Sequence, residues 1–215
     1  MSTTCILEAP SEIFPDRTKQ TTAVSSDRAH WDRLIGCSRI IAAVRKEEKL
    51  VYALDSPVEV VYLLYGNPLN LRRTIETVRK HGKLPLVNVD LVQGLSRDAS
   101  AVEYLAQCGA AGVISTNQET LRATRANGLI SVLRTFTIDT SAVEAGRRFL
   151  SNFQPDAVEM LPAIAAPLVV DKLRAIHPAI RIIAGGLVQD LQMVVRLIDA
   201  GIDAVSIGDP GLWVI

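Results

Sequence analysis

The amino-acid sequence predicts a TIM-barrel-like (β/α)8 fold, in which eight parallel strands alternate with helices around a closed barrel. Two observations lead to this prediction. Eight apolar, β-branched runs begin about 18 to 28 residues apart, which is the room that one strand, one helix and two short loops need. The segments between them have helical periodicity with recognisable start and stop signals. With 215 residues, 48% of them hydrophobic, the chain is long enough to build one such barrel.

Most of the eight expected strands lack strict alternation of polar and apolar residues. This pattern is typical of strands that are covered on both faces, as they are in parallel sheets. An open, doubly wound sheet is the alternative arrangement, but eight regularly spaced strands favour closure. The expected strands are residues 39–44, 58–65, 84–90, 111–116, 130–136, 157–161, 180–186 and 203–208.

Seven helices are expected between these strands. Pro68 near the start of the second helix and Gly82 just past its end are typical boundary residues. Thr116 followed three residues later by Glu119 is a capping-box pattern at the start of the fourth. The expected helices span residues 47–54, 68–81, 97–107, 117–127, 141–151, 166–176 and 188–200.

The two ends of the chain depart from a regular barrel. The sequence stops at Ile215, a few residues after the eighth strand, so a full eighth helix is predicted to be missing. Residues 26–37 form an amphipathic pattern, and we expect this helix, or a second subunit, to cover the gap between strands eight and one. Residues 1–25, rich in Ser, Thr and Pro, are predicted to be a flexible tail, and residues 26–215 a single domain.

Composition excludes several classes of protein. Lys plus Arg equals Asp plus Glu, at 23 each, so a strongly basic nucleic-acid surface is not indicated, although a local patch is compatible with this total. The three cysteines match no zinc or redox spacing, and we expect neither a metal nor a cofactor. The sequence has no secretory signal and no run of about 18 apolar residues, so a cytoplasmic location without a membrane partner is predicted.

Polar residues gather where the expected strands end. Barrels of this kind carry their sites at the carboxyl ends of the strands. No histidine and no strand-end lysine falls there, which favours binding of a small phosphorylated ligand over imidazole or Schiff-base catalysis. The candidate contacts to ligand and phosphate are Arg45, Asp90, Ser115, Arg134, Glu159, Gly185, Gly186, Ser206 and Gly208.

Gly185 and Gly186 end the seventh expected strand and allow two interpretations. They are either a turn that needs a positive φ angle or a stretch of backbone left bare so that an anion approaches its amides. Barrels often bind phosphate between the loops after strands seven and eight. Because Ser206 and Gly208 end the eighth strand, the phosphate interpretation gains weight.

Arg134 is a charge inside an apolar strand and therefore needs a partner. A structural ion pair with Glu159 or Asp90 and a bound anion are equally compatible with the sequence. Asp90 and Glu159 are also candidates for an acid/base pair, although carboxylates at such positions more often satisfy neighbouring loops.

Stretches from about residue 39 to 213 resemble one known family when they are taken in order. They are RIIAAVRK, EVVYLLYGN, DLVQGLSRDASAVEYL, GVISTN, LRTFTIDTSAVE, PDAVEMLPA, RIIAGGLV and AVSIGDPGLW. By these stretches the chain resembles the glycerol-3-phosphate-responsive antiterminators, regulators of glycerol uptake operons. The resemblance implies a TIM-barrel-like fold, glycerol 3-phosphate as effector, and binding to the leader of a nascent messenger RNA to prevent premature termination.

Four positions depart from the pattern of that family. Arg45 stands where a lysine is expected, Asn88 where a histidine is expected, Asn117 where a lysine is expected, and Ala163 where a glycine is expected. Arg45 keeps the charge, whereas the changes at Asn88 and Asn117 remove an imidazole and a cation. These departures concern the identity of the effector more than the fold.

The residues alone give weaker signals for RNA. The sequence holds no RNA-recognition motif, and aromatic residues make up only 5%. The predicted RNA contacts are the basic residues Arg72, Arg73, Arg79 and Lys80 on the second helix. Such outward charges are usually solvated, but a homodimer would present a continuous stripe of them to phosphates.

Three functions are compatible with these observations. The first is a ligand-responsive antitermination regulator of glycerol uptake and metabolism genes, which is more a regulator than an enzyme. The second is an enzyme that acts on a small phosphorylated metabolite through Asp90 and Glu159. The third is a sensor of a phosphorylated metabolite that works through protein partners.

Overall fold

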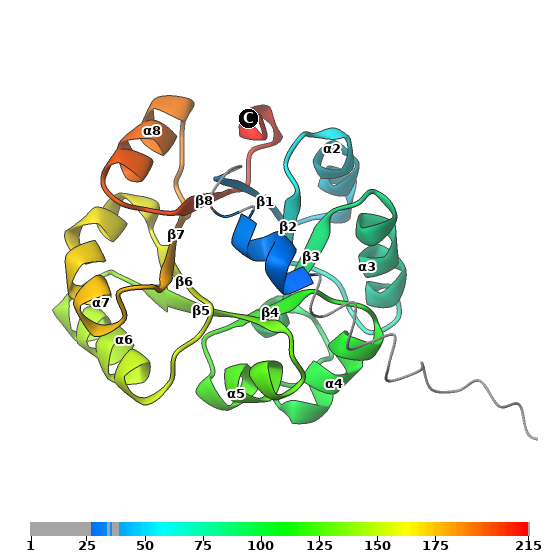
Figure 1. The fold of residues 1–215 in the computed structure, drawn as a ribbon. Coiled ribbons are helices and arrows are strands. Elements are labelled where there is room, and N and C mark those ends of the chain that lie inside the picture. The colour runs from blue at the N-terminus through cyan, green and yellow to red at the C-terminus, as the bar shows by residue number, and fades with distance from the viewer. Residues whose placement is uncertain (1–26, 34, 36–38, 215) are drawn as a thin grey trace, which may run out of the picture.

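A closed barrel of eight parallel strands forms the centre of the molecule (Figure 1). The computed structural model describes residues 27–33, 35 and 39–214. Strand β1 pairs with both β2 and β8, which confirms the predicted barrel and excludes the open sheet. The strands are β1 (Ile40–Val44), β2 (Val60–Leu63), β3 (Leu84–Asn88), β4 (Gly112–Ser115), β5 (Ile130–Phe136), β6 (Ala157–Leu161), β7 (Arg181–Gly185) and β8 (Ala204–Ile207).

Within the described part of the chain, seven helices surround the barrel, one after each of the first seven strands (Figure 1). They are α2 (Leu50–Asp55), α3 (Leu71–Lys80), α4 (Ala99–Gln107), α5 (Gln118–Ala126), α6 (Thr140–Asn152), α7 (Val170–Ile176) and α8 (Leu191–Asp199). Short 3-10 turns accompany them at η1 (Glu47–Lys49), η2 (Val89–Leu91), η3 (Ala163–Leu168) and η4 (Pro210–Leu212).

All of these helices except α6 begin later than the sequence predicts, and the delays at α7 and α8 have identifiable causes. The helix expected over 166–176 is divided into η3 and α7, because Pro167 within η3 has no N–H to donate to a regular helical ladder. The helix expected from residue 188 begins at Leu191, where the Asp190 side chain accepts a hydrogen bond from the Met193 amide and caps the first turn. The loop between β7 and α8 is therefore longer than predicted.

Alternating strand residues divide the core into two layers. Side chains that point inward fill the barrel, among them Ile41, Tyr62 and Ile183. Side chains that point outward, such as Val61 and Ile182, pack against the helices. Both faces of the strands are thus buried, which explains why the strand sequences show no polar alternation.

The N-terminal helix (residues 27–33 and 35) lies across the amino end of the barrel, where Figure 1 shows it in dark blue over the strands. Trp31 and Ile35 are buried among the inward-facing strand residues. Arg28 pairs with Asp156, which immediately precedes β6. This helix therefore closes one end of the barrel and does not cover the gap between strands eight and one. Its apolar face fits the open barrel interior, which no other described segment fills from that end. The other alternative, a second subunit over that gap, stays a prediction.

Trp213 closes the gap between β8 and β1 instead. Its ring is buried with the outward-facing residues of both strands, and its Nε1 donates a hydrogen bond of 2.7 Å to the Ile207 carbonyl. After β8 the described chain forms only η4, as the prediction of a missing eighth helix requires. The predicted tail over residues 1–25 lies outside the described residues. No helix in the described ranges is long and apolar enough to cross a membrane.

Candidate ligand site at the carboxyl end of the barrel

A cavity of about 220 Å³ opens at the carboxyl ends of the strands. Six of the nine predicted contact residues line it, namely Arg45, Arg134, Glu159, Gly186, Ser206 and Gly208. The other lining residues are Ala43, Leu64, Leu161, Leu187, Val188 and Asp209. The cavity thus lies mainly between the loops that follow β1, β6, β7 and β8, the region where barrels often bind phosphate.

A chain of three side chains forms the polar floor of the cavity, which consists of Arg134, Glu159 and Ser206. Arg134 Nε donates to Glu159 Oε2 at 2.7 Å, and Ser206 Oγ donates to Glu159 Oε1 at 2.6 Å. Glu159 is 1% exposed and the Arg134 side chain 10%. A buried carboxylate with both oxygens satisfied is held rigidly, while Arg134 keeps further N–H groups with which it can donate to a ligand in the cavity.

Tyr62 lies beside the polar floor inside the barrel. Burial raises the pKa of its phenol well above the ordinary value, and the Glu159 carboxylate raises it further. The phenol is therefore neutral and can donate a hydrogen bond, yet its hydroxyl has no partner within the described residues. Asn88 Nδ2 is likewise buried without a partner among them. Both groups add donor capacity to the interior near the site.

Gly185 and Gly186 serve two different purposes. A Cβ at Gly185 would overlap Ser206 Oγ and stand 3.1 Å from Glu159 Oε1, so glycine there leaves room for the polar floor. Gly186 has a φ of +76°, the left-handed region that favours glycine. Leu187 continues in the same region with a φ of +59°, although it is not glycine. The loop that follows β7 is thus a strained turn whose backbone borders the cavity.

Arg45 supplies an exposed cation at the rim of the cavity. Within the part of the chain that the structure describes, its guanidinium takes part in no ion pair, in contrast to Arg134 in the polar floor. Lys49 adds a second positive charge nearby, because its Nζ donates to the Gly208 carbonyl at 3.3 Å. Asp209 is the opposing charge, and its side chain caps η4 by accepting from the Gly211 amide. The rim therefore combines two cations with backbone that an anion can approach.

Asp90 and Ser115 lie outside this cavity. Asp90 accepts hydrogen bonds from Ser115 Oγ at 2.7 Å and from the amide and hydroxyl of Thr116 at 2.7 and 2.9 Å. These bonds tie the end of β3 to the end of β4. The two residues thus satisfy neighbouring loops, and within the described residues no hydrogen bond joins Asp90 to Glu159, which is bonded to Arg134 and Ser206 instead.

The four predicted RNA contacts on α3 differ in their exposure and in the hydrogen bonds and ion pairs that they make within the protein. Arg79 pairs with Asp27 of the N-terminal helix and also bonds the Gly109 carbonyl. Arg72 donates to the Gln107 carbonyl at 3.0 Å, and Arg73 lies 3.6 Å from Glu47. Lys80 is exposed. Arg79 is therefore engaged in holding the N-terminal helix, and the other three are on the surface.

The groups that line the cavity suit a ligand with phosphate and hydroxyl groups. Within the described ranges, no group of three or more His, Cys, Asp or Glu side chains could hold a metal ion. The cavity contains a paired carboxylate, a hydroxyl and two guanidinium groups, which bind phosphate and hydroxyl groups well.

Comparison with known proteins decides the family. A sequence profile described as glycerol-3-phosphate responsive antiterminator matches residues 40–213, which is nearly the whole barrel. The chain belongs to this family. It is 32% identical over 178 residues to the Escherichia coli K12 protein YgcP, a match that covers 81% of this chain and 91% of YgcP.

Two solved structures of similar sequence share the barrel. One is a glycerol uptake operon antiterminator-related protein from Thermotoga maritima, with 30% identity, a TM-score of 0.74, and 81% of this chain and 96% of that chain covered. The other is the glycerol uptake operon antiterminator regulatory protein from Listeria monocytogenes, with 28% identity, a TM-score of 0.78, and 82% and 95% covered. An aldolase at 13% identity and a TM-score of 0.62 shares the fold alone.

Sequence reasoning missed several features of the site. The apolar residues that line the cavity were not among the predicted contacts, namely Ala43, Leu64, Leu161, Leu187 and Val188. Tyr62 lies in the middle of an apolar strand, where a tyrosine is typical of an ordinary core position. Its position in the strand could have indicated this role. Tyr62 is one of the alternate residues of β2 that point into the barrel, and only Leu63 follows it before the strand ends.

Proposed function

We propose that the chain is a transcription antitermination regulator that binds glycerol 3-phosphate in the cavity at the carboxyl end of the barrel. Membership of the family supports the effector, and the geometry of the cavity supports a small phosphorylated polyol. In this arrangement Arg45 and the backbone after β7 and β8 hold the phosphate, while the polar floor and Tyr62 hold the hydroxyl groups. The observation that carries the proposal is the exposed Arg45 guanidinium above a polar floor in which Arg134 is bonded to Glu159 through Nε alone.

Binding of glycerol 3-phosphate is measured by calorimetry and by thermal unfolding of the full chain, because a ligand that binds only the folded state raises the unfolding temperature. We expect glycerol 3-phosphate to stabilise the protein, whereas glycerol and inorganic phosphate alone bind much more weakly. Arg45→Ala should weaken binding by roughly tenfold or more, since it removes a charged contact. Lys80→Ala on α3 is the matched control. Equal stabilisation by glycerol 3-phosphate in Arg45→Ala would contradict the assignment of the phosphate.

The regulatory half of the proposal concerns nascent messenger RNA, which places the action in the cytoplasm. Effector binding is proposed to shift the chain toward a state that binds an RNA leader, and linkage requires that RNA in turn tightens effector binding. A single-round transcription assay on the leader of a glycerol uptake operon tests this. We expect read-through of the terminator to rise when protein and glycerol 3-phosphate are both present. Read-through that does not depend on the effector would contradict the proposal.

A further inference from the structure

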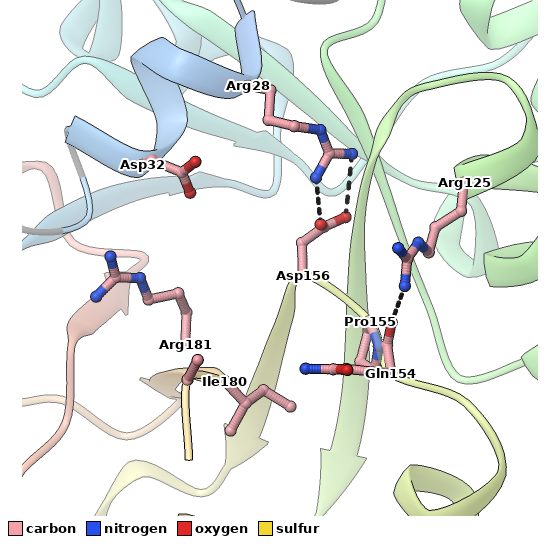
Figure 2. Close-up of a pocket in the computed structure, with 9 residues that line it drawn as sticks. Arg28, Asp32, Arg125, Gln154, Pro155, Asp156, Ile180 and Arg181 are labelled. Carbon is pink, nitrogen blue, oxygen red and sulfur yellow. Dashed lines mark hydrogen bonds and ion pairs between the residues drawn. The ribbon is translucent and has the colours of Figure 1, made fainter. Parts of the chain in front are cut away.

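A second cavity, of about 480 Å³, lies at the opposite end of the barrel from the ligand site (Figure 2). Its walls come from the N-terminal helix, the end of α5, the loop before β6 and the loop before β7. The lining residues include Arg28, Asp32, Arg125, Gln154, Asp156 and Arg181. Its volume falls in the range of about 300 to 1,000 Å³ that sites for small organic groups occupy.

Three arginines from three separate elements surround this cavity, and two of them keep most of their donors free. Arg125 uses one nitrogen to donate to the Gln154 carbonyl. Arg181 makes a long contact of 3.5 Å to Asp203. Arg28 is committed to Asp156, and it also bonds the Leu129 carbonyl. Because a guanidinium has five N–H donors in a planar fork, Arg125 and Arg181 can each still bind an anion.

Acceptor and mixed groups lie among these donors. Figure 2 shows Asp32 near Arg181 on one side of the cavity and Arg125 on the other, with the Arg28–Asp156 pair between them. Asp32 is exposed and forms none of the ion pairs found in the described ranges. The exposed Gln154 amide offers both a donor and an acceptor. The cavity therefore combines anion-binding groups with groups that pair with the polar edge of a ring.

The Arg125 guanidinium lies within cation–π distance of an aromatic ring. Its Cζ lies 5.9 Å from the centre of the Phe153 ring, and the Cζ of Arg122 lies 5.3 Å from the same ring. Phe153 also packs edge-on against Phe149. The Phe153 ring therefore stabilises two guanidinium groups beside the cavity, and Arg125 keeps N–H groups with which it can bind a phosphate.

We propose that this cavity binds one nucleotide of a single-stranded RNA, with the two phosphates that flank the nucleotide on Arg125 and Arg181, at opposite sides of the cavity, and its base edge on Asp32 and Gln154. The inference rests on the RNA binding in the proposed function, and it assigns the RNA contact to the amino end of the barrel rather than to α3. Single-stranded bases are recognised on their Watson–Crick edges, which carry both amino donors and carbonyl acceptors. The Asp32 carboxylate beside Arg181, with the Arg125 guanidinium across the cavity, suits such a nucleotide better than it suits an inorganic anion.

The test is fluorescence anisotropy with the full chain and a fluorescein-labelled single-stranded RNA of mixed sequence, in the presence of glycerol 3-phosphate. The variant is Arg125→Gln with Arg181→Gln. We expect it to bind RNA roughly tenfold more weakly, and the slope of log affinity against log salt concentration to fall by about 0.7 for each phosphate that it no longer neutralises. Its affinity for glycerol 3-phosphate should stay unchanged, because the ligand cavity lies at the other end of the barrel. The control is Arg72→Gln with Arg73→Gln on α3, which should bind RNA as the wild type does.

Each outcome decides one question. Weaker RNA binding in the Arg125 and Arg181 variant, with unchanged unfolding temperature and unchanged RNA binding in the α3 control, supports the inference. RNA binding that survives in this variant, or that disappears in the α3 control instead, overturns the inference and leaves the proposed function intact. No RNA binding by the wild type overturns both. Competition by free mononucleotides at equal potency with the RNA would assign the cavity to a nucleotide effector and contradict the RNA contact.

Discussion

Arg134 and Glu159 stand side by side inside the barrel because the parallel register of β5 and β6 pairs these two residues. The bond of 2.7 Å between Arg134 Nε and Glu159 Oε2 joins two charges that are almost fully buried. Neither charge could be buried there without the other, because it would lose its hydration and gain no ion pair in return. The pair therefore fixes the shape of the polar floor and also contributes a guanidinium to the ligand cavity.

Single and double variants of the Arg134–Glu159 pair can distinguish its contribution to stability from its contribution to ligand binding. Glu159→Leu leaves Arg134 as an unpaired buried charge and should lower the free energy of unfolding by about 3 to 5 kcal/mol. Adding Arg134→Met removes the second charge, and the double variant should recover most of the missing stability. Glycerol 3-phosphate should fail to stabilise either variant in thermal unfolding. If the double variant bound glycerol 3-phosphate as tightly as the wild type, the polar floor would have no part in binding.

Gly185 should tolerate no side chain. In Gly185→Ala the new Cβ overlaps Ser206 Oγ, so the hydrogen bond from Ser206 to Glu159 must break or the strands must shift. We expect a decrease of about 1 to 3 kcal/mol in the free energy of unfolding, measured by urea denaturation. The control is Gly208→Ala, where the nearest atom to an added Cβ is the Ala43 carbonyl oxygen at 3.8 Å. Equal stability of the two variants would show that Gly185 is an ordinary turn residue.

The sequence predicts the barrel well because each strand is recognisable from its local sequence. An apolar, β-branched run followed by a helical pattern needs only neighbouring residues to be identified. The exact cap is harder to predict: the capping box expected at Thr116 is wrong, because the Asn117 side chain caps α5 and the Thr116 hydroxyl bonds Asp90. The site is predicted only in part because its members meet through the barrel. The role of Gly185 depends on Ser206 and Glu159, which lie far away along the chain.

The roles of charged residues are also mispredicted, because their partners lie far away in the sequence. Asp90 resembles a site carboxylate because it follows a strand, yet its partners Ser115 and Thr116 on the next strand end occupy its oxygens. Arg79 resembles an outward charge on α3, yet it bonds Asp27, and no local pattern indicates a partner at that separation. The N-terminal helix shows the limit most clearly, since its amphipathic face predicts a packing partner without indicating which one.

Trp31 tests the placement of the N-terminal helix at the amino end of the barrel. The ring is 1% exposed among inward-facing strand residues, so Trp31→Ala should lower the free energy of unfolding by about 3 to 5 kcal/mol. Arg33→Ala is the control on the same helix, because the Arg33 side chain is 61% exposed and its ion pair with Glu59 is a contact of 3.6 Å. That change should alter stability by less than about 0.5 kcal/mol. A small effect of Trp31→Ala would mean that the helix does not close the barrel.

Lys83 holds the loop before β2 through its ammonium group. Its Nζ donates to the carbonyls of Ser56 and Val58 at 2.6 and 2.7 Å, and the residue is buried. Lys83→Met leaves both carbonyls without this donor and should cost about 1 to 3 kcal/mol in the free energy of unfolding. Lys80→Met, at an exposed position of α3, is the matched control and should be nearly neutral.

The difference in free energy of unfolding between the wild type and Lys83→Met should change with pH in a defined direction. Burial lowers the pKa of Lys83 below its ordinary value of 10.5, so the folded chain releases this proton at a lower pH than the unfolded chain does. Between the lowered pKa and 10.5 the unfolded state binds more protons, and stability therefore rises with pH in that window. The advantage of the wild type over Lys83→Met should grow as the pH increases through it, which urea denaturation at a series of alkaline pH values measures. A difference that is constant or shrinks with pH would show that Lys83 stays charged in the fold.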